Sequence, residues 1–315
     1  MMTLIWMFLG FILLAIGSKF VIRSAVAISL KFNISKFLIG MTVVAFATSI
    51  PELFITLKSA IYGYSSVAIN NVIGSNIVNI ALVLGLTSLI GDVLVPKLFY
   101  KITWPVMFLF TLLLYLFMVN DNLLNKYEGF ILLICLIFYL IFLIRKSNFN
   151  IITKDSAFET TEKTSPIKII IWILISSFSL YFGAEWLIFG AIDLAKSIGV
   201  SEAVISVTVI AIGTSVPEIA TSIVAIGNNE KSISIGTLIG SNIFNIGSVL
   251  GLTAIIKPIL IQDLDIISRD VSAMIIFTFL ALVLSFLPKK SIITKLKGFL
   301  LVTFYSMYLI YVFYY

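Results

Sequence analysis

The sequence contains no histidine, a single cysteine and few charged side chains. Without histidine, the chain has no histidine-ligated zinc site, no Ser-His catalytic pair and no histidine proton relay, so we expect it not to be an enzyme. Cys135 lies in an apolar run, and we interpret it as a small hydrophobic residue. Charged residues make up 11% of the chain, whereas average soluble domains carry about 25%. Such a shortage of charge is not typical of a soluble domain.

Apolar residues, in contrast, make up 60% of the 315 residues. They gather in ten segments, most of them near the ~20 residues that cross a ~30 Å hydrocarbon core. The segments are 4–29, 35–60, 66–90, 102–119, 127–145, 167–196, 202–227, 232–256, 270–287 and 293–314. The sequence therefore predicts an all-α polytopic membrane protein with ten transmembrane helices in the lipid bilayer. Aspartates outside or at the ends of these segments, Asp270 among them, are expected in solvated loops.

The one sizeable polar gap, 146–166, is rich in Ser, Thr, Lys and Glu and reads as a flexible linker. It separates residues 1–145, with five helices, from residues 167–315, with five more. With the N-terminus outside, the cytoplasmic loops hold fifteen Lys and Arg and the external loops hold five, a strong positive-inside bias. We expect a cytoplasmic linker and both termini outside. The net charge of +6 then reflects membrane orientation, and no nucleic-acid partner is expected.

The two halves repeat each other at an offset of 166 residues. Residues 41–56 match 207–222 at seven of sixteen positions, and 69–87 match 235–253 at thirteen of nineteen. Because each half has an odd number of spans, the second half enters the membrane from the opposite side, as in transporters built from inverted repeats with broken helices at the centre. A duplication without a shared site is the alternative, but the preserved positions are polar ones within apolar segments.

The first repeated motif is Thr48-Ser49-Ile50-Pro51-Glu52, which returns as Thr214-Ser215-Val216-Pro217-Glu218. A carboxylate at membrane depth is costly and marks a functional site. Proline lacks an N–H and breaks the helix, which leaves backbone carbonyls that are tolerated only beside protein or a polar cavity. The alternative is a capped kink, because Ser49 and Glu52 have the spacing of a capping box. We expect both glutamates at one cation site.

The second repeated motif spans Gly74 to Asn79 and Gly240 to Asn245, with the pattern G-S-N-x-x-N in both copies. Residues four apart share a helix face, so Ser75 lies above Asn79. Hydrogen bonding between packed helices is the competing interpretation. Together the motifs offer carboxylate, hydroxyl, amide and carbonyl oxygens, which suit Ca²⁺ and Na⁺. Two glutamates neutralise one divalent cation, so exchange of Na⁺ for Ca²⁺ is physically reasonable.

These paired motifs resemble the α-repeats of the sodium/calcium exchanger family, in its prokaryotic form. The resemblance covers nearly the whole chain and implies a secondary antiporter that exchanges Na⁺ for Ca²⁺ by alternating access, with no organic cofactor. It also implies twelve ion-binding residues: Glu52, Glu218, Thr48, Ser49, Thr214, Ser215, Ser75, Ser241, Asn79 and Asn245, with the carbonyls of Ala45 and Ala211. We expect the protein to work as a monomer.

One position departs from the pattern of many relatives. Asn245 stands where prokaryotic and potassium-dependent members often carry aspartate, which argues against potassium co-transport. A proton- or potassium-coupled calcium exchanger remains the alternative among transporters. A cation channel would use the same oxygen ligands, but it would need no counter-ion.

Overall fold

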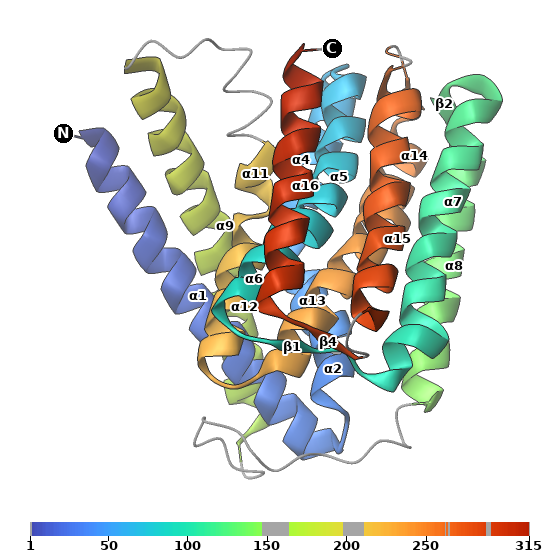
Figure 1. The fold of residues 1–315 in the computed structure, drawn as a ribbon. Coiled ribbons are helices and arrows are strands. Elements are labelled where there is room, and N and C mark those ends of the chain that lie inside the picture. Colours follow the sequence, from blue (N-terminus) through green and yellow to red (C-terminus); the bar gives the residue numbers. More distant parts are fainter. Residues whose placement is uncertain are drawn as a thin grey trace.

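The protein is a bundle of long helices in a computed structural model that describes residues 2–146, 164–197, 211–261, 263, 265–287 and 291–314 (Figure 1). In the first half, helices are interrupted by short π-helical turns, labelled η. The elements are α1 (Met2–Phe32), α2 (Lys36–Ile39), η1 (Gly40–Val44), α3 (Ala45–Thr48), α4 (Ile50–Ile61), α5 (Ser65–Val78), η2 (Asn79–Val83), α6 (Leu84–Ile90), β1 (Val93–Leu94), η3 (Phe99–Thr103), α7 (Trp104–Asp121), β2 (Leu123–Leu124) and α8 (Lys126–Lys146).

The second half repeats this order of elements. They are α9 (Pro166–Ser197), α11 (Ala211–Thr214), α12 (Val216–Gly227), α13 (Lys231–Phe244), η6 (Asn245–Leu250), α14 (Gly251–Ile256), β3 (Ile259–Leu260), η7 (Ile266–Val271), α15 (Ser272–Phe286), β4 (Ile292–Ile293) and α16 (Lys295–Tyr314). The bounds of α3, α4 and α5 recur at α11, α12 and α13 at the offset of 166 residues. The sequence repeat is therefore also a repeat of local structure.

Eight helices among the described residues are long and apolar enough to cross a membrane, and a ninth span results if a bent pair of helices is counted as one. That pair is Lys36–Thr48 with Ile50–Ile61, bent by 42°. The expected segment 202–227 lies partly outside the described residues, and its described part ends in the twelve-residue α12. The structure is thus a helical membrane bundle. The strands among the described residues are four short ones of two residues each.

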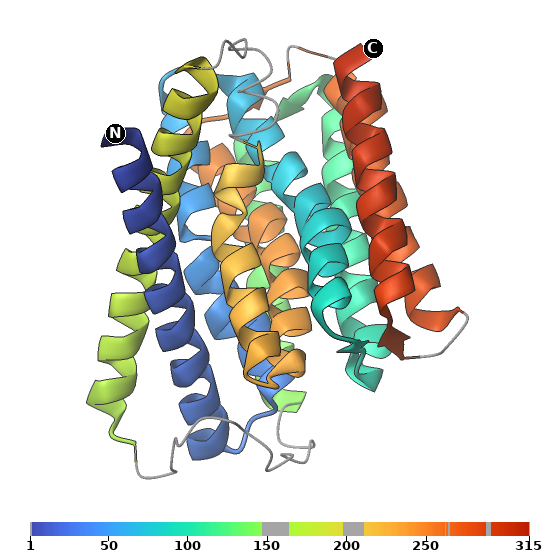
Figure 2. The ribbon, with the colours of Figure 1, turned by 60° about the vertical axis from the view of Figure 1, so that its left-hand side comes forward.

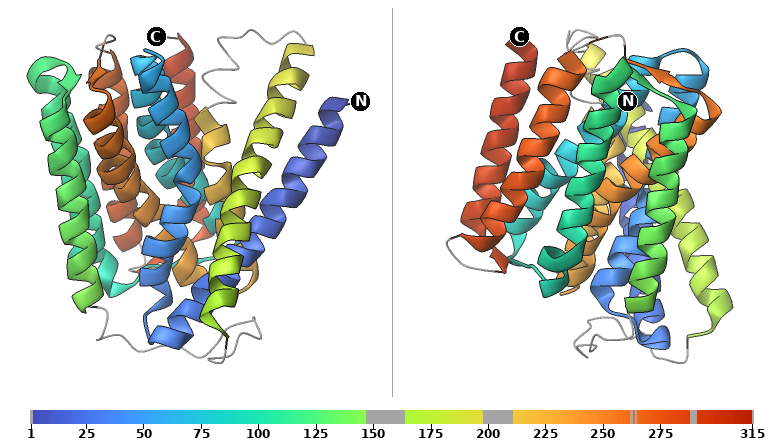
Figure 3. Two further views of the ribbon diagram at one scale, coloured as in Figure 1. Left: turned by 180° about the vertical axis from the view of Figure 1, so that it is seen from behind. Right: turned by 90° about the vertical axis from the view of Figure 1, so that its right-hand side faces the viewer.

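Two helices form the centre of the bundle. In the span Ser65–Ile90, 72% of the residues in its apolar 18-residue stretch are buried, and in Lys231–Ile256 the share is 78%. In the other single spans it is 22–44%. Figure 1 shows α1 and α9 side by side at one edge of the bundle and α7 and α8 at the other, and α1 and α9 are again side by side in Figure 2. The view from behind in Figure 3 has the same order. The central helices carry the G-S-N-x-x-N motif, so this motif lies away from lipid.

Two short ribbons and a close helix contact join the halves. Strand β1 pairs with β4, and β2 pairs with β3, both antiparallel. Helix α13 packs so tightly on α2 and η1 that a Cβ on Gly236 would collide with the carbonyl oxygen of Phe37, and one on Gly240 with that of Met41. Only glycine permits this approach of two backbones. The halves therefore share one core.

Candidate cation site

The first break in the helices occurs at Ser49. Helix α3 ends at Thr48, Ser49 leaves helical geometry with φ −83° and ψ 4°, and α4 starts at Ile50 with Pro51 in its first turn. The backbone N–H of Ser49 still donates to the carbonyl of Ala45 at 3.0 Å. Because Pro51 has no N–H, the helix changes direction here. The predicted opening of the helix at this motif is confirmed.

The second break has nearly the same backbone angles as the first, although its backbone hydrogen bond reaches three residues back and not four. Ser215 has φ −86° and ψ 5° between α11 and α12, and its N–H donates to the carbonyl of Ile212 at 3.0 Å. Pro217 again occupies the first turn of the helix that follows. Two copies of one five-residue motif therefore fold in one way, as expected when the local sequence decides the backbone path.

Each break places a glutamate in the first turn of the next helix, fully buried. Glu52 and Glu218 are both 0% exposed, and Ser241, which donates to Glu218, lies 3.3 Å from Thr48, one helical turn before Glu52. Neither Ser49 nor Ser215 caps its helix with its side chain. The capped-kink interpretation therefore fails, because these glutamates are not used to complete a capping box.

Hydroxyl groups connect each break to the second motif of the other half. The Oγ1 of Thr48 lies 3.3 Å from the Oγ of Ser241, and the Oγ of Ser75 lies 3.1 Å from the Oγ1 of Thr214. Both contacts are buried, and the offset of 166 relates one to the other. The Oγ of Ser241 also donates to Oε1 of Glu218 at 3.3 Å. The two motifs of the sequence repeat thus meet at one place.

Four asparagines on the central helices form a second connection. The Nδ2 of Asn79 donates to Oδ1 of Asn242 at 3.1 Å, and the Nδ2 of Asn245 donates to Oδ1 of Asn76 at 3.1 Å. Asn76 and Asn242 also donate to each other's backbone carbonyl at 3.2 and 3.1 Å. Asn79 and Asn245 begin η2 and η6, which pack on α12 and α4, the helices of the two glutamates.

Several buried oxygens of these motifs have no hydrogen-bond partner within the described part of the chain. They are Ser49 Oγ, Glu52 Oε1 and Oε2, Asn79 Oδ1, Ser215 Oγ, Glu218 Oε2 and Asn245 Oδ1. Burying polar oxygens without partners is costly, and a bound cation removes that cost. Among the described residues, no three His, Cys, Asp or Glu side chains lie close enough together to hold a metal ion by themselves. Two carboxylates with hydroxyl and amide oxygens are a donor set for hard cations such as Ca²⁺ and Na⁺.

Seven of the twelve predicted residues take part in these side-chain contacts: Thr48, Thr214, Ser75, Ser241, Glu218, Asn79 and Asn245. Ser49, Glu52 and Ser215 are buried at the two breaks. The carbonyl of Ala45 accepts from Thr48 and Ser49 in this structure. Ala211 begins α11, and its surroundings lie outside what the structure describes. Asn76 and Asn242 were not singled out by the sequence reasoning, although their identity in both copies of the motif was a usable signal.

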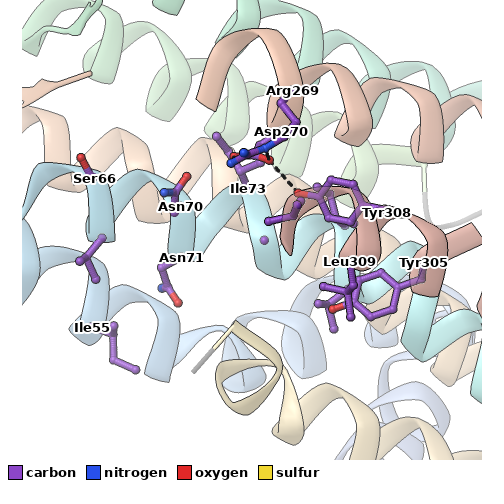
Figure 4. A pocket seen from close by; sticks show the side chains of 15 residues that line it. Ile55, Ser66, Asn70, Asn71, Ile73, Arg269, Asp270, Tyr305, Tyr308 and Leu309 are labelled. Carbon is purple, nitrogen blue, oxygen red and sulfur yellow. Dashed lines mark hydrogen bonds and ion pairs between the residues drawn. The ribbon is translucent and has the colours of Figure 1, made fainter. Parts of the chain in front are cut away.

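A cavity of about 330 Å³ lies between α4, α5, η7 and α16 (Figure 4), and its wall contains none of the twelve predicted ligands. Asn71, on its wall, donates to Oγ1 of Thr56 at 2.9 Å and to the carbonyl of Glu52 at 3.4 Å. Asp270, predicted to be solvated, is 6% exposed here and accepts from Arg269 and from the hydroxyl of Tyr308. The prediction for Asp270 was wrong because two donors satisfy its carboxylate inside the bundle.

Comparison with known proteins agrees with this geometry. The family model described as "Sodium/calcium exchanger protein" matches residues 2–145 and 168–314. The CaxA protein of Alkalimonas amylolytica is 33% identical over 300 residues, which cover 93% of both chains. The sodium/calcium exchanger MaX1 of Methanosarcina acetivorans is 27% identical, with 97% of both chains covered. A solved structure of the sodium-calcium exchanger NCX_Mj, soaked with Na⁺ and Sr²⁺, superposes with a TM-score of 0.81 at 28% identity over 97% of both chains. The chain therefore belongs to the sodium/calcium exchanger protein family.

Proposed function

We propose that this chain is a secondary antiporter that exchanges Na⁺ for Ca²⁺ across the membrane. The observation that carries the proposal is a pair of fully buried glutamates, Glu52 and Glu218, in the same two motifs as serine and asparagine oxygens that have no partner among the described residues. Their two negative charges balance one Ca²⁺, or two Na⁺ held at neighbouring oxygens. Because one set of ligands serves both ions, occupancy by one ion opposes the other, which is the condition for exchange.

Within this proposal the ion ligands are the twelve residues expected from the sequence. Glu52 and Glu218 hold the central position, with Thr48, Ser49, Thr214 and Ser215 at the breaks beside them. Ser75, Ser241, Asn79 and Asn245 supply oxygens from the central helices, and the carbonyls of Ala45 and Ala211 complete the set during transport. The hydrogen bond between Thr48 and Ala45 would then have to open for that carbonyl to bind an ion.

The proposed architecture is ten spans in two inverted five-helix repeats, residues 1–145 and 167–315, joined by a cytoplasmic linker at 146–166. The equal bounds of α3–α5 and α11–α13 support the duplication. Both chain ends on one side of the bundle in Figure 1 fit termini that face outward, as the distribution of Lys and Arg predicts. Alternating access would move the outer helices, α1 and α9 among them, past the central ones. The working unit is proposed to be a monomer in the bilayer.

The test is calcium uptake into liposomes that contain the purified chain. An outward sodium gradient should drive uptake of radiolabelled Ca²⁺, and collapsing that gradient should stop it. Uptake that needs a proton or potassium gradient and runs without sodium would support the alternative exchanger and contradict the proposal. Calcium flux that follows its own gradient with no counter-ion would indicate a channel and would also contradict it.

A further inference from the structure

The asparagine cluster on the central helices contains two residues, Asn76 and Asn242, that are not among the expected ion ligands. Each is about 1% exposed and satisfied by hydrogen bonds. Asn79 and Asn245, in contrast, each keep a buried Oδ1 without a partner among the described residues. An amide side chain can present either an acceptor oxygen or a donor NH₂ group. Something must therefore decide which of the two ends Asn79 and Asn245 turn away from the cluster.

A backbone carbonyl decides which end of the Asn245 amide turns away from the cluster. The carbonyl of Asn242 only accepts, so the end of Asn76 that faces it, at 3.2 Å, must be the NH₂ group. The Oδ1 of Asn76 is then left for Asn245, which has to donate with Nδ2, at 3.1 Å. The Oδ1 of Asn245 consequently points away from Asn76, and a cation can use it. The orientation rests on this chain of donors and acceptors and not on the shape of the amide.

The same sequence of bonds exists in the other half. The carbonyl of Asn76 orients Asn242 at 3.1 Å, and Oδ1 of Asn242 accepts from Nδ2 of Asn79, also at 3.1 Å. The Oδ1 of Asn79 is thereby also left without a partner in the part of the chain that the structure describes. Each half thus fixes the ligand amide of the other half, because every one of these four bonds crosses between α5–η2 and α13–η6.

We propose that Asn76 and Asn242 are positioning residues that hold the amides of Asn245 and Asn79 with oxygen, and not NH₂, toward the transported cation. The inference rests on the proposed function, since it concerns how that ion site is built. An amide turned the other way would place a donor hydrogen against a cation, which lowers affinity. Partners that orient metal ligands typically change metal affinity by roughly 10–100-fold when they are removed.

The alternative is that these bonds only join two helices. Hydrogen bonds between amide side chains of neighbouring membrane helices do stabilise packing. If that were their whole role, Asn76→Ala would impair the protein equally in the wild type, in Asn245→Asp and in Asn79→Asp. The positioning role makes a narrower claim, because aspartate has oxygen at both ends and needs no orienting partner. Asn245→Asp should therefore make Asn76 dispensable for calcium affinity. Asn79→Asp should not, because Asn242 orients that side chain.

The experiment measures the half-saturating Ca²⁺ concentration for sodium-driven uptake into liposomes. Asn76→Ala should raise it by about 10-fold or more while changing the maximal rate less. In an Asn245→Asp background, Asn76→Ala should raise the half-saturating Ca²⁺ concentration little further. In an Asn79→Asp background, Asn76→Ala should raise it as much as it does in the wild type. For Asn242→Ala the two backgrounds should exchange roles. It should raise the half-saturating concentration little in the Asn79→Asp background and fully in the Asn245→Asp background. Calcium binding to the purified variants by calorimetry gives the same comparison if an aspartate variant transports poorly.

Asn70→Ala is the matched control, because Asn70 lies on α5, is exposed, and belongs to no bond of the cluster. It should leave the half-saturating concentration unchanged. Equal effects of Asn76→Ala in all three backgrounds, or no effect in any, would overturn the positioning role. Wild-type liposomes without sodium-driven uptake would instead overturn the proposed function, so the two failures are distinguishable.

Discussion

Lys36, the first residue of α2, and Glu230, in the loop before α13, form a buried ion pair. The Nζ of Lys36 lies 2.9 Å from Oε1 and 2.8 Å from Oε2 of Glu230, and their side chains are 9% and 1% exposed. At the offset of 166 the equivalent positions hold Glu202 and Tyr64, which cannot form such a pair. The pair is therefore a feature of one end of the bundle only, at the close contact of α13 with α2.

Breaking this pair should destabilise the protein. Glu230→Gln removes the carboxylate that pairs with the buried charge of Lys36, and breaking a buried ion pair by removing one partner typically costs about 3–5 kcal/mol. The double variant Lys36→Met with Glu230→Leu removes both charges and should recover most of that loss. Thermal unfolding in detergent measures both. Lys231→Gln, which removes a neighbouring positive charge outside the pair, serves as the control. If it lowers the stability as much as Glu230→Gln does, the stabilising role of the Lys36–Glu230 pair is contradicted.

Neutralising either central glutamate should abolish exchange without unfolding the chain. Glu52→Gln keeps the size of the side chain but leaves one carboxylate to balance a divalent ion, and Glu218→Gln does the same from the other half. Neither Oε atom of Glu52 has a partner among the described residues, so the substitution breaks no hydrogen bond in the structure. Calcium uptake should vanish while the melting temperature stays the same or rises. Normal uptake by either variant would refute a shared site.

A third carboxylate should make transport sensitive to acid. Asn245→Asp adds a negative charge near Glu52 and Glu218, and clustered carboxylates hold protons more tightly than isolated ones. Protons then compete with Ca²⁺, so uptake by the variant should fall on acidification at a higher pH than uptake by the wild type. The measurement is the pH profile of initial uptake at fixed sodium gradient. Superimposable profiles and cation preferences would place Asn245 outside the site.

Equivalent glycines of the two halves should respond differently to the same substitution. A Cβ on Gly240 would collide with Met41 and Ala45, whereas a Cβ on Gly74 would meet no described atom within 4 Å. Gly240→Ala should cost about 1–3 kcal/mol through overpacking. Gly74→Ala should be neutral or stabilising by up to about 1 kcal/mol, because alanine favours the helix. Unfolding in detergent compares the two, and equal effects would contradict the packing difference.

Much of the site was readable from the sequence because its chemistry is unusual for its surroundings. Glutamates after proline in apolar segments, present twice at one offset, predict a break and a buried cation ligand from local rules alone. The resemblance to the exchanger family also named the hydroxyl residues of both motifs as expected ligands, whereas their pairing across the halves came from the structure. Asp270 shows the limit of this reasoning, since its burial depends on Tyr308, 38 residues away, which no local pattern connects to it.

The sequence by itself determined the membrane class, the duplication, the two helix breaks and the oxygen-only set of candidate ligands, because each depends on composition or on neighbouring residues. Only the tertiary structure decided which atoms remain without partners. Within the described residues, Asn76 and Asn242 are satisfied while Asn79 and Asn245 each keep an oxygen without a partner, and this follows from hydrogen bonds between residues more than 160 positions apart. Such bonds depend on the packing of α5 against α13, which sequence spacing does not encode.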